Sequence, residues 1–113
     1  MGILMQRGDI VVCVLSGDYG KPRPAVVVQS DLFNPTHASL VISPITTHLV
    51  SAPLFRLSVK PSKQNGLKKK SQIMVGKLTA IKTEKITKVI GKLTEKECQQ
   101  LNDALRLWLD LTD

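Results

Sequence analysis

Short runs of β-branched residues, each followed by a cluster of turn-forming residues, constrain this chain more than any other feature. The first run is DIVVCVL, Asp9–Leu15, and the turn cluster SGDYG follows it at 16–20. A second run, AVVVQS, covers Ala25–Ser30. Runs of this length and composition are typical of β-strands, and the Gly, Ser and Asp between them mark a turn. Because the connection is short, we expect the two strands to pair antiparallel.

Four further segments have the pattern of short strands. They are Ala38–Ile45, Leu54–Val59, Ser71–Leu78 and Thr87–Leu93. Pro44 lies near the end of the first of them, and because proline cannot donate a ladder hydrogen bond we expect it at an edge or a bend. A polar loop with five lysines, 60–70, precedes the segment that starts at Ser71. The pattern therefore predicts about six short strands.

The period of the apolar residues changes near the C-terminus, where it becomes helical. Apolar side chains recur there at steps of three and four, at Cys98, Leu101, Ala104, Leu105, Trp108 and Leu111. Thr94 and Glu97 have the spacing of a capping box, so the helix should begin at Thr94. Short strands followed by one amphipathic helix predict a mainly β fold, a strongly bent sheet or small barrel. A chain of 113 residues has the size of one domain, which we place at 1–113.

The charge balance is basic, with 16 Lys and Arg against 9 Asp and Glu and a net charge of +7. Such an excess favours a polyanionic partner, which includes nucleic acid, an anionic membrane surface and an acidic protein. No stretch approaches the roughly 20 apolar residues that cross a bilayer. Cys13 and Cys98 lack the spacing of a zinc site or a disulfide framework, so we expect reduced core thiols. These features predict a soluble, cytoplasmic protein without membrane attachment.

Common hydrolase motifs are missing from the sequence. There is no G-x-S-x-G, no H-E-x-x-H and no P-loop, so serine hydrolase and metal-dependent hydrolase chemistry are not indicated. The two histidines, His37 and His48, lie in polar, loop-like stretches, where we expect surface positions without a function. Composition and periodicity alone thus lead to a basic, β-rich, single-domain protein.

Four ordered sequence blocks resemble the MazF/PemK family of toxins from bacterial type II toxin-antitoxin systems. The blocks are QRGDI (Gln6–Ile10), KPRPAVVVQSDLFN (Lys21–Asn34), ISPITT (Ile42–Thr47) and SQIMVGKLTAIKTEKITKVIGKL (Ser71–Leu93). Together with the closing helix, the resemblance covers nearly the whole chain. It implies an SH3-like twisted barrel of the CcdB/MazF type that forms a homodimer.

The resemblance also implies an activity, which is metal-independent and sequence-selective cleavage of single-stranded mRNA. In this reaction the ribose 2′-OH attacks the adjacent phosphate, which leaves a 2′,3′-cyclic phosphate and a 5′-OH. No cofactor is implied. The second implied partner, besides RNA, is an acidic and partly disordered antitoxin that occupies the RNA groove.

Three positions match the catalytic positions of the family. Arg23, in the K-x-R-P block, corresponds to the catalytic arginine, whose planar guanidinium can hold two phosphate oxygens. Thr46 corresponds to the hydroxyl residue that hydrogen-bonds the scissile phosphate. Gly76 stands where many relatives carry an acidic residue, and Thr79 stands where some carry arginine. We therefore expect attenuated activity, and we expect Gly76→Asp to raise the cleavage rate.

Cations and loop aromatics are the candidates for RNA contact. The cations are Lys21, Lys68, Lys69, Lys70 and Lys77, because phosphate binding needs positive charges along the backbone. Tyr19 and Phe33 lie in predicted loops, where they can stack on unpaired bases. Thr47 adds a hydroxyl beside Thr46. For Trp108 we expect packing or a dimer contact instead.

Two alternatives remain open on the sequence. The first is a non-enzymatic toxin on the same barrel that poisons DNA gyrase, as CcdB-like toxins do, and the missing carboxylate favours it. The K-P-R-P and S-P-I-T-T blocks favour the RNA-cleaving branch instead. The second is a toxin that still binds RNA and antitoxin but has lost its catalysis.

Overall fold

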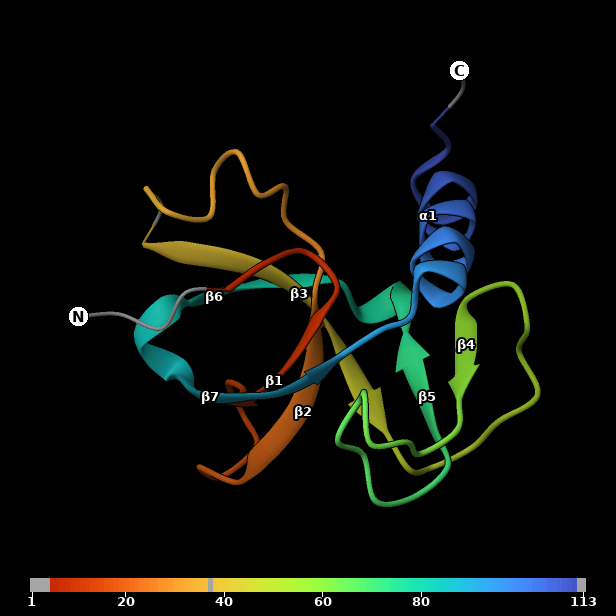
Figure 1. Cartoon of the computed structure of the whole chain (residues 1–113), viewed down its shortest axis with the longest axis horizontal. Coiled ribbons are helices and arrows are strands. Elements are labelled where there is room, and N and C mark those ends of the chain that lie inside the picture. The colour runs from red at the N-terminus through yellow and green to blue at the C-terminus, as the bar shows by residue number, and fades with distance from the viewer. Residues whose placement is uncertain (1–4, 37, 112–113) are drawn as a thin grey trace.

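Seven strands and one α-helix form the part of the chain that the computed structural model describes, residues 5–36 and 38–111 (Figure 1). The strands are β1 (Asp9–Val14), β2 (Pro22–Val27), β3 (Ser39–Thr46), β4 (Arg56–Val59), β5 (Ser71–Met74), β6 (Thr79–Lys82) and β7 (Ile86–Lys92). Two single-turn 3₁₀ helices, η1 (Val75–Lys77) and η2 (Thr83–Lys85), flank β6, and the helix α1 covers Glu95–Leu109. The mainly β fold with a C-terminal helix confirms the prediction from the sequence.

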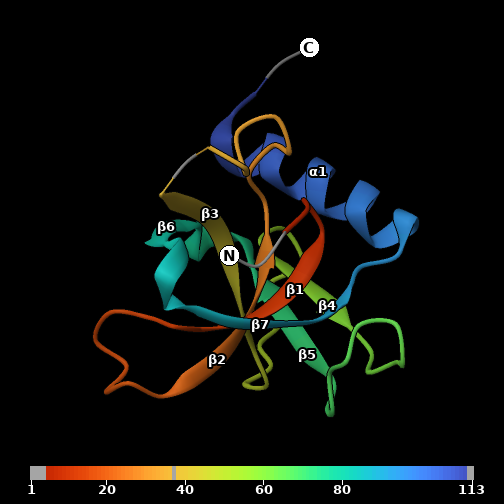
Figure 2. The ribbon, with the colours of Figure 1, turned by 60° about the vertical axis from the view of Figure 1, so that its left-hand side comes forward.

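All strand pairs are antiparallel, in the order β4-β5-β3-β2-β1-β7, and β6 pairs with β3 as well. Strand β3 therefore has two partners on one edge: residues 39–42 pair with β6, and residues 45–46 pair with β5. Pro44 lies between these two stretches, where β3 changes its partner and an N–H on that edge is not needed. The sheet as a whole is strongly curved (Figure 2).

Buried side chains form two apolar clusters on the two faces of the central strands. Alternate residues go to opposite faces, so Ile10 and Val26 lie in one cluster while Val11, Ala25 and Val27 lie in the other. The first cluster also takes residues from β4, β5 and α1, and the second takes residues from β3 and β7. Because both faces of β1 and β2 are buried, the sequence runs that form these strands are almost continuously apolar.

The helix α1 begins as the sequence predicts. The Thr94 hydroxyl accepts a hydrogen bond from the Glu97 N–H at 3.1 Å, and the Glu97 carboxylate accepts one from the Thr94 N–H at 2.9 Å. Leu101 and Leu105 are buried, but Trp108 is 47% exposed, so the apolar stripe is covered only over its first turns. No helix among residues 5–36 and 38–111 has the length and apolar character that a membrane span requires.

Two predicted strands differ from the observed ones. The segment predicted as one strand, 71–78, divides into β5 and η1, and the chain then continues as the additional strand β6. It divides because β5 pairs with the end of β3 and β6 pairs with its beginning, so the chain must step along β3. Strand β2 starts at Pro22 rather than Ala25. Its first three residues pair with β1 only, so one edge of the strand has no partner there. The missing N–H groups of Pro22 and Pro24 are tolerated at such an edge.

Candidate functional site

A cleft of about 430 Å³ lies between the β1–β2 loop and the ends of β3 and β4. It brings together Arg23 from β2, Thr46 from the end of β3 and Lys77 from η1, three of the residues predicted from the sequence. It also contains Asp18, His48 and Arg56. Residues far apart in the sequence thus meet in one cavity because β2 and β3 are neighbours in the sheet.

Arg23 is held by a carboxylate of the loop that precedes its strand. Its Nε donates to Asp18 Oδ2 at 2.7 Å, and its Nη2 donates to Asp18 Oδ1 at 3.3 Å. The hydrogen bond from Arg23 lowers the pKa of the Asp18 carboxyl, and the same pair raises the pKa of the guanidinium. The Arg23 side chain remains 43% exposed. This contact fixes the guanidinium at the wall of the cleft while leaving part of it open to a ligand.

Thr46 is the last residue of β3, and its side chain organises the segment that follows. The Thr46 hydroxyl oxygen accepts a hydrogen bond from the His48 N–H at 3.0 Å. The hydroxyl proton is then available to donate to an oxygen in the cleft, since an O–H group can accept and donate at once. The same turn places His48 in the lining.

The buried side-chain amide of Gln72 holds the segment that follows Thr46. Gln72 on β5 is 7% exposed, and its Oε1 accepts from Arg56 Nη1 at 2.8 Å and from the Val50 N–H at 3.1 Å. Its Nε2 donates to the Val50 carbonyl at 2.9 Å, and Arg56 Nη1 also donates to the His48 carbonyl at 3.0 Å. This hydrogen-bonded network holds two residues that line the cleft, Arg56 through its guanidinium and His48 through its backbone carbonyl.

The charges of the lining residues favour an anionic ligand. The lining contains one carboxylate, Asp18, and three cations, namely Arg23, Arg56 and Lys77. A guanidinium, a hydroxyl and further cations around one cavity are the groups that bind a phosphodiester and stabilise the extra negative charge of its transition state. Across the described residues, no group of three or more His, Cys, Asp or Glu side chains is placed to hold a metal ion.

Several predicted RNA contacts do not line this cleft. They are Tyr19, Lys21, Phe33, Thr47, Lys68, Lys69 and Lys70. Tyr19 is fully exposed at the tip of the β1–β2 loop. Phe33 is 47% exposed in the turn after β2, at the other end of that strand from Arg23. Lysines 68–70 precede β5 on the loop 60–70. The role of these residues as RNA contacts remains a prediction.

Gly76 lines a smaller groove beside the cleft rather than the cleft itself. A Cβ atom at this position would lie 3.1 Å from Cη2 and 3.2 Å from Cζ2 of Trp108. The position to which the family resemblance assigns an acidic residue is thus closely approached by an indole ring. The catalytic role of this position remains a prediction.

The sequence analysis missed three residues that line the cleft, Asp18, Arg56 and His48, and the buried Gln72 that binds Arg56. Asp18, Arg56 and His48 lie outside the blocks that carry the family resemblance, and Gln72 lies in the fourth block, where the resemblance assigns it no role. The available signal for His48 was its position two residues after Thr46. His37 lies outside the described residues.

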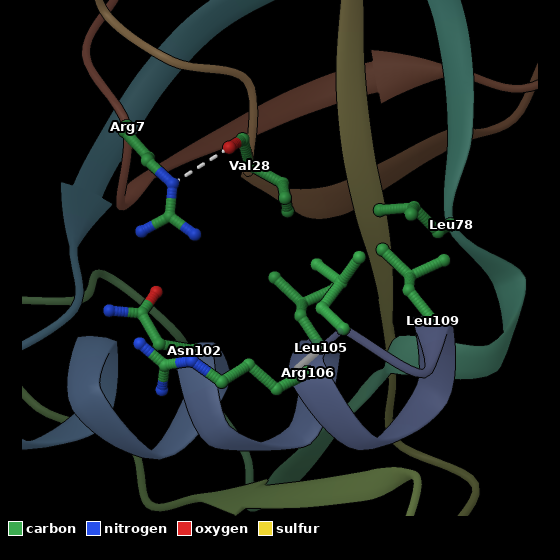
Figure 3. Close-up of a pocket in the computed structure, with 8 residues that line it drawn as sticks. Arg7, Val28, Leu78, Asn102, Leu105, Arg106 and Leu109 are labelled. Atoms are coloured by element: carbon green, nitrogen blue, oxygen red, sulfur yellow. Dashed lines mark hydrogen bonds between the residues drawn. The ribbon is translucent and has the colours of Figure 1, made fainter. Parts of the chain in front are cut away.

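A separate cavity of about 250 Å³ lies between α1 and the end of β2 (Figure 3). Its lining is mostly apolar and includes Val28, Leu78 and Leu105. Arg7 lies at one side of it, where its Nε donates to the Val28 carbonyl at 2.8 Å. None of the predicted site residues lines this cavity, so it is not part of the candidate site.

Comparison with known proteins shows the family of the chain. Residues 6–109 match the model of a family described as PemK-like, MazF-like toxin of type II toxin-antitoxin system. A relative from Mycolicibacterium smegmatis named "Probable endoribonuclease MazF" is 36% identical over 108 residues, 95% of this chain and 98% of its own. "Endoribonuclease MazF9" from Mycobacterium tuberculosis is 30% identical over 117 residues, 96% of this chain and 98% of its own.

A solved structure has the same fold. It is described as an endoribonuclease in complex with its cognate antitoxin from a mycobacterial species, and it aligns with a TM-score of 0.82 at 20% identity. The alignment covers 97% of this chain and 99% of that one. Nearly full coverage by the family model and by both relatives leads to one conclusion: the chain belongs to the PemK-like, MazF-like toxin family of type II toxin-antitoxin systems.

Proposed function

We propose that this chain is a metal-independent endoribonuclease that cleaves single-stranded RNA at selected sequences and acts as the toxin of its pair. The observation that carries the proposal is the convergence of Arg23 and Thr46, from two neighbouring strands, on one positively charged cleft. The names of the relatives, which are endoribonucleases, support the same activity.

The cleavage reaction consists of three events. The 2′-oxygen attacks the phosphorus and loses its proton, the bond from phosphorus to the 5′-oxygen breaks, and the leaving oxygen gains a proton. Arg23 stabilises the added charge on the non-bridging oxygens, and Thr46 donates a hydrogen bond to one of them. Histidine is the commonest proton-transfer residue in enzymes, and His48 lines this cleft, so we assign both transfers to it: its ring takes the proton of the 2′-OH and gives a proton to the leaving 5′-oxygen.

The test is a cleavage assay on single-stranded RNA in EDTA. The wild-type chain should give fragments that end in 2′,3′-cyclic phosphate, and Arg23→Ala should lower the rate at least about a hundredfold, since loss of one oxyanion donor costs that much. Thr46→Val removes the hydroxyl at nearly constant shape and should also slow cleavage. Arg106→Ala is the matched control, because it removes an arginine that does not line the cleft.

The outcome that overturns the proposal is specific. If neither the wild-type chain nor Gly76→Asp cleaves any single-stranded RNA, the chain is not an endoribonuclease. A supercoiling assay with gyrase then tests the CcdB-like activity directly.

The partners follow from the family. We assign an acidic antitoxin as the inhibitor that covers the positive cleft, a homodimer as the assembly and the bacterial cytoplasm as the location. The solved relative in complex with its cognate antitoxin supports the first of these. Co-expression with an acidic reading frame adjacent to the gene should relieve growth inhibition, and light scattering of the purified toxin should give twice the mass of the chain.

A further inference from the structure

One asparagine of the chain is followed by glycine. The sequence contains three asparagines, and with the next residue they form the pairs Asn34–Pro35, Asn65–Gly66 and Asn102–Asp103. An asparagine side chain is lost as ammonia when the backbone nitrogen of the next residue attacks its amide carbon. Proline has no N–H group, and the side chain of aspartate shields its nitrogen, whereas glycine leaves the nitrogen open. Asn65 is therefore the most reactive asparagine of the unfolded chain.

The folded loop 60–70 holds the side-chain amide of Asn65 on both of its polar atoms. Its Oδ1 accepts from the Ser62 N–H at 3.0 Å and from the Leu67 N–H at 2.9 Å, and its Nδ2 donates to the Lys60 carbonyl at 2.8 Å. The residue is only 2% exposed. Rotation of the amide toward the Gly66 nitrogen would break these bonds at a place where water cannot replace them.

The nitrogen that would attack is held as well. The Gly66 N–H donates to the Ser62 carbonyl at 3.0 Å, so the proton that the nitrogen must lose is bound. Gly66 has a φ of +70°, and a Cβ atom there would overlap the Ile90 carbonyl oxygen. Only glycine fits such a position. The fold thus requires at 66 the one residue type that makes the unfolded chain reactive.

Strand β7 closes the loop from its other side. The Lys92 N–H donates to the Gln64 carbonyl at 2.9 Å, which ties the two backbones together. A Cβ atom at Gly91 would overlap the carbonyl carbon of Asn65. The main chain at 65 and 66 therefore has no space for an additional atom.

From these contacts we infer that Asn65–Gly66 is a deamidation site, which the folded chain blocks and the unfolded chain exposes. The Gly66 nitrogen loses its proton and bonds to Asn65 Cγ, the Cγ–Nδ2 bond breaks, and Nδ2 leaves with that proton as ammonia. Water then opens the succinimide ring. Breakage of the bond from nitrogen to Cγ leaves aspartate, and breakage of the bond to the main-chain carbonyl carbon leaves isoaspartate.

Neither product fits the folded loop. Aspartate lacks the Nδ2 donor, so a carboxylate oxygen would face the Lys60 carbonyl oxygen without a proton between them, in a buried site. Isoaspartate routes the main chain through Cβ and so adds one backbone atom against β7, where not even a Cβ atom has space. A chain that deamidates while unfolded is consequently lost from the native population.

This inference does not depend on the reaction in the cleft. Asn65 is also buried within its own chain, so its protection does not depend on the face that a second copy covers.

The test compares the folded chain with the chain unfolded in guanidinium chloride, at the same mildly alkaline pH and temperature. Mass spectrometry of proteolytic peptides follows the conversion of amide to carboxyl at Asn65, and the peptide that contains Asn102 is the internal control. We expect Asn65 to react first in the unfolded chain. In the folded chain its reaction should be at least about a hundredfold slower, because the rate is limited by the small population of open loop.

Ser62→Ala tests whether the loop itself provides the protection. The Ser62 hydroxyl accepts from the Asn65 N–H at 3.1 Å, and the substitution leaves the bonds of the Asn65 side chain in place. Deamidation of the folded chain should become about fivefold faster, the effect of one hydrogen bond on an opening equilibrium. Ser51→Ala is the matched control, because Ser51 is exposed and lies outside the loop, and it should leave the rate unchanged.

Refolding tests whether the modified chain is lost. A sample that is partly deamidated in guanidinium chloride is diluted into buffer, and the folded fraction is isolated by size-exclusion chromatography and verified by circular dichroism. We expect this fraction to contain only chains with the amide at residue 65.

Three outcomes would overturn the inference. The first is deamidation of Asn65 at equal rates in the folded and the unfolded chain, and the second is an unfolded chain that reacts first at Asn102. The third is a folded fraction after dilution that contains the same share of modified chains as the whole sample.

Discussion

The Gln72 side chain is the point at which removal of a few atoms should affect both stability and the cleft. Substitution by leucine keeps the volume and removes three hydrogen bonds, two with the Val50 backbone and one with the Arg56 guanidinium. At about 1 kcal/mol for each neutral bond and about 2 kcal/mol for the charged one, the loss is about 4 kcal/mol. Burial of the apolar leucine side chain offsets about 1 kcal/mol. The expected net loss is therefore about 3 kcal/mol in the free energy of unfolding.

Urea denaturation measures this loss. With a slope of about 1.5 kcal/mol per molar for a domain of this size, the midpoint should fall by about 2 M. Because Gln72 also positions the segment after Thr46, the value of kcat/KM for RNA cleavage should fall at least about tenfold under conditions where the variant is folded. Gln72→Glu retains both accepted bonds and loses only the donated one, so it should lie between the wild type and Gln72→Leu.

The matched control is Gln64→Leu. Gln64 is exposed, and its side chain makes one long bond, from Nε2 to the Leu93 carbonyl at 3.3 Å. This substitution should change the free energy of unfolding by less than about 0.5 kcal/mol. If Gln72→Leu unfolds at the wild-type urea midpoint and cleaves RNA at the wild-type rate, the buried network does not hold the cleft.

Three further predictions concern single groups. Arg23→Ala should raise the carboxyl pKa of Asp18 toward its usual value, as measured by NMR titration. Because the pKa is lowered in the folded chain, the Arg23–Asp18 pair stabilises the fold above the usual aspartate pKa of about 3.9. This contribution to the free energy of unfolding is lost as the pH falls through the lowered pKa. Gly76→Asp should raise kcat by supplying a carboxylate but should also raise KM, since its Cβ crowds Trp108, and steady-state kinetics separate the two effects. Burial raises the pKa of the Cys13 thiol to about 11, so a thiol reagent at pH 8 should label it only after unfolding, and mass spectrometry of the intact protein detects the label.

The sequence predicts those parts of the fold that local patterns control. The β-branched run from Asp9 and the capping box at Thr94 specify a strand and a helix start without any information from distant residues. The break of the predicted strand at Val75 depends on which part of β3 is available as a partner, and that is a property of the whole sheet. Sequence period alone therefore could not separate β5 from β6.

In the candidate site too, some residues could be predicted from local sequence and others could not. Arg23 and Thr46 could be predicted because they lie in blocks that resemble a family, and the structure brings both to one cleft. Asp18 and Arg56 lie outside those blocks, and Gln72 lies in the Ser71–Leu93 block without a role that the resemblance assigns. The importance of these residues arises from contacts across 5, 16 and 22 residues of sequence. Such contacts follow from the tertiary fold and have no local sequence signal.

The β1–β2 loop, which lines the cleft, and the lysine-rich loop 60–70, which does not, differ in how firmly they are attached. In the lysine-rich loop 60–70, the buried Asn65 side chain accepts from Ser62 and Leu67 and donates to the Lys60 carbonyl. The backbone there also lies so close to β7 that a Cβ at Gly91 would be 2.4 Å from the carbonyl carbon of Asn65.

Amide hydrogen exchange in this loop should consequently be as slow as global unfolding allows, while the β1–β2 loop, with Tyr19 fully exposed at its tip, should exchange quickly. The loop 60–70 is then rigid, and the β1–β2 loop can change its conformation. We therefore expect the β1–β2 loop to adjust to different nucleotide sequences, so grafting the 15–21 segment of a relative onto this chain should change sequence preference without changing stability.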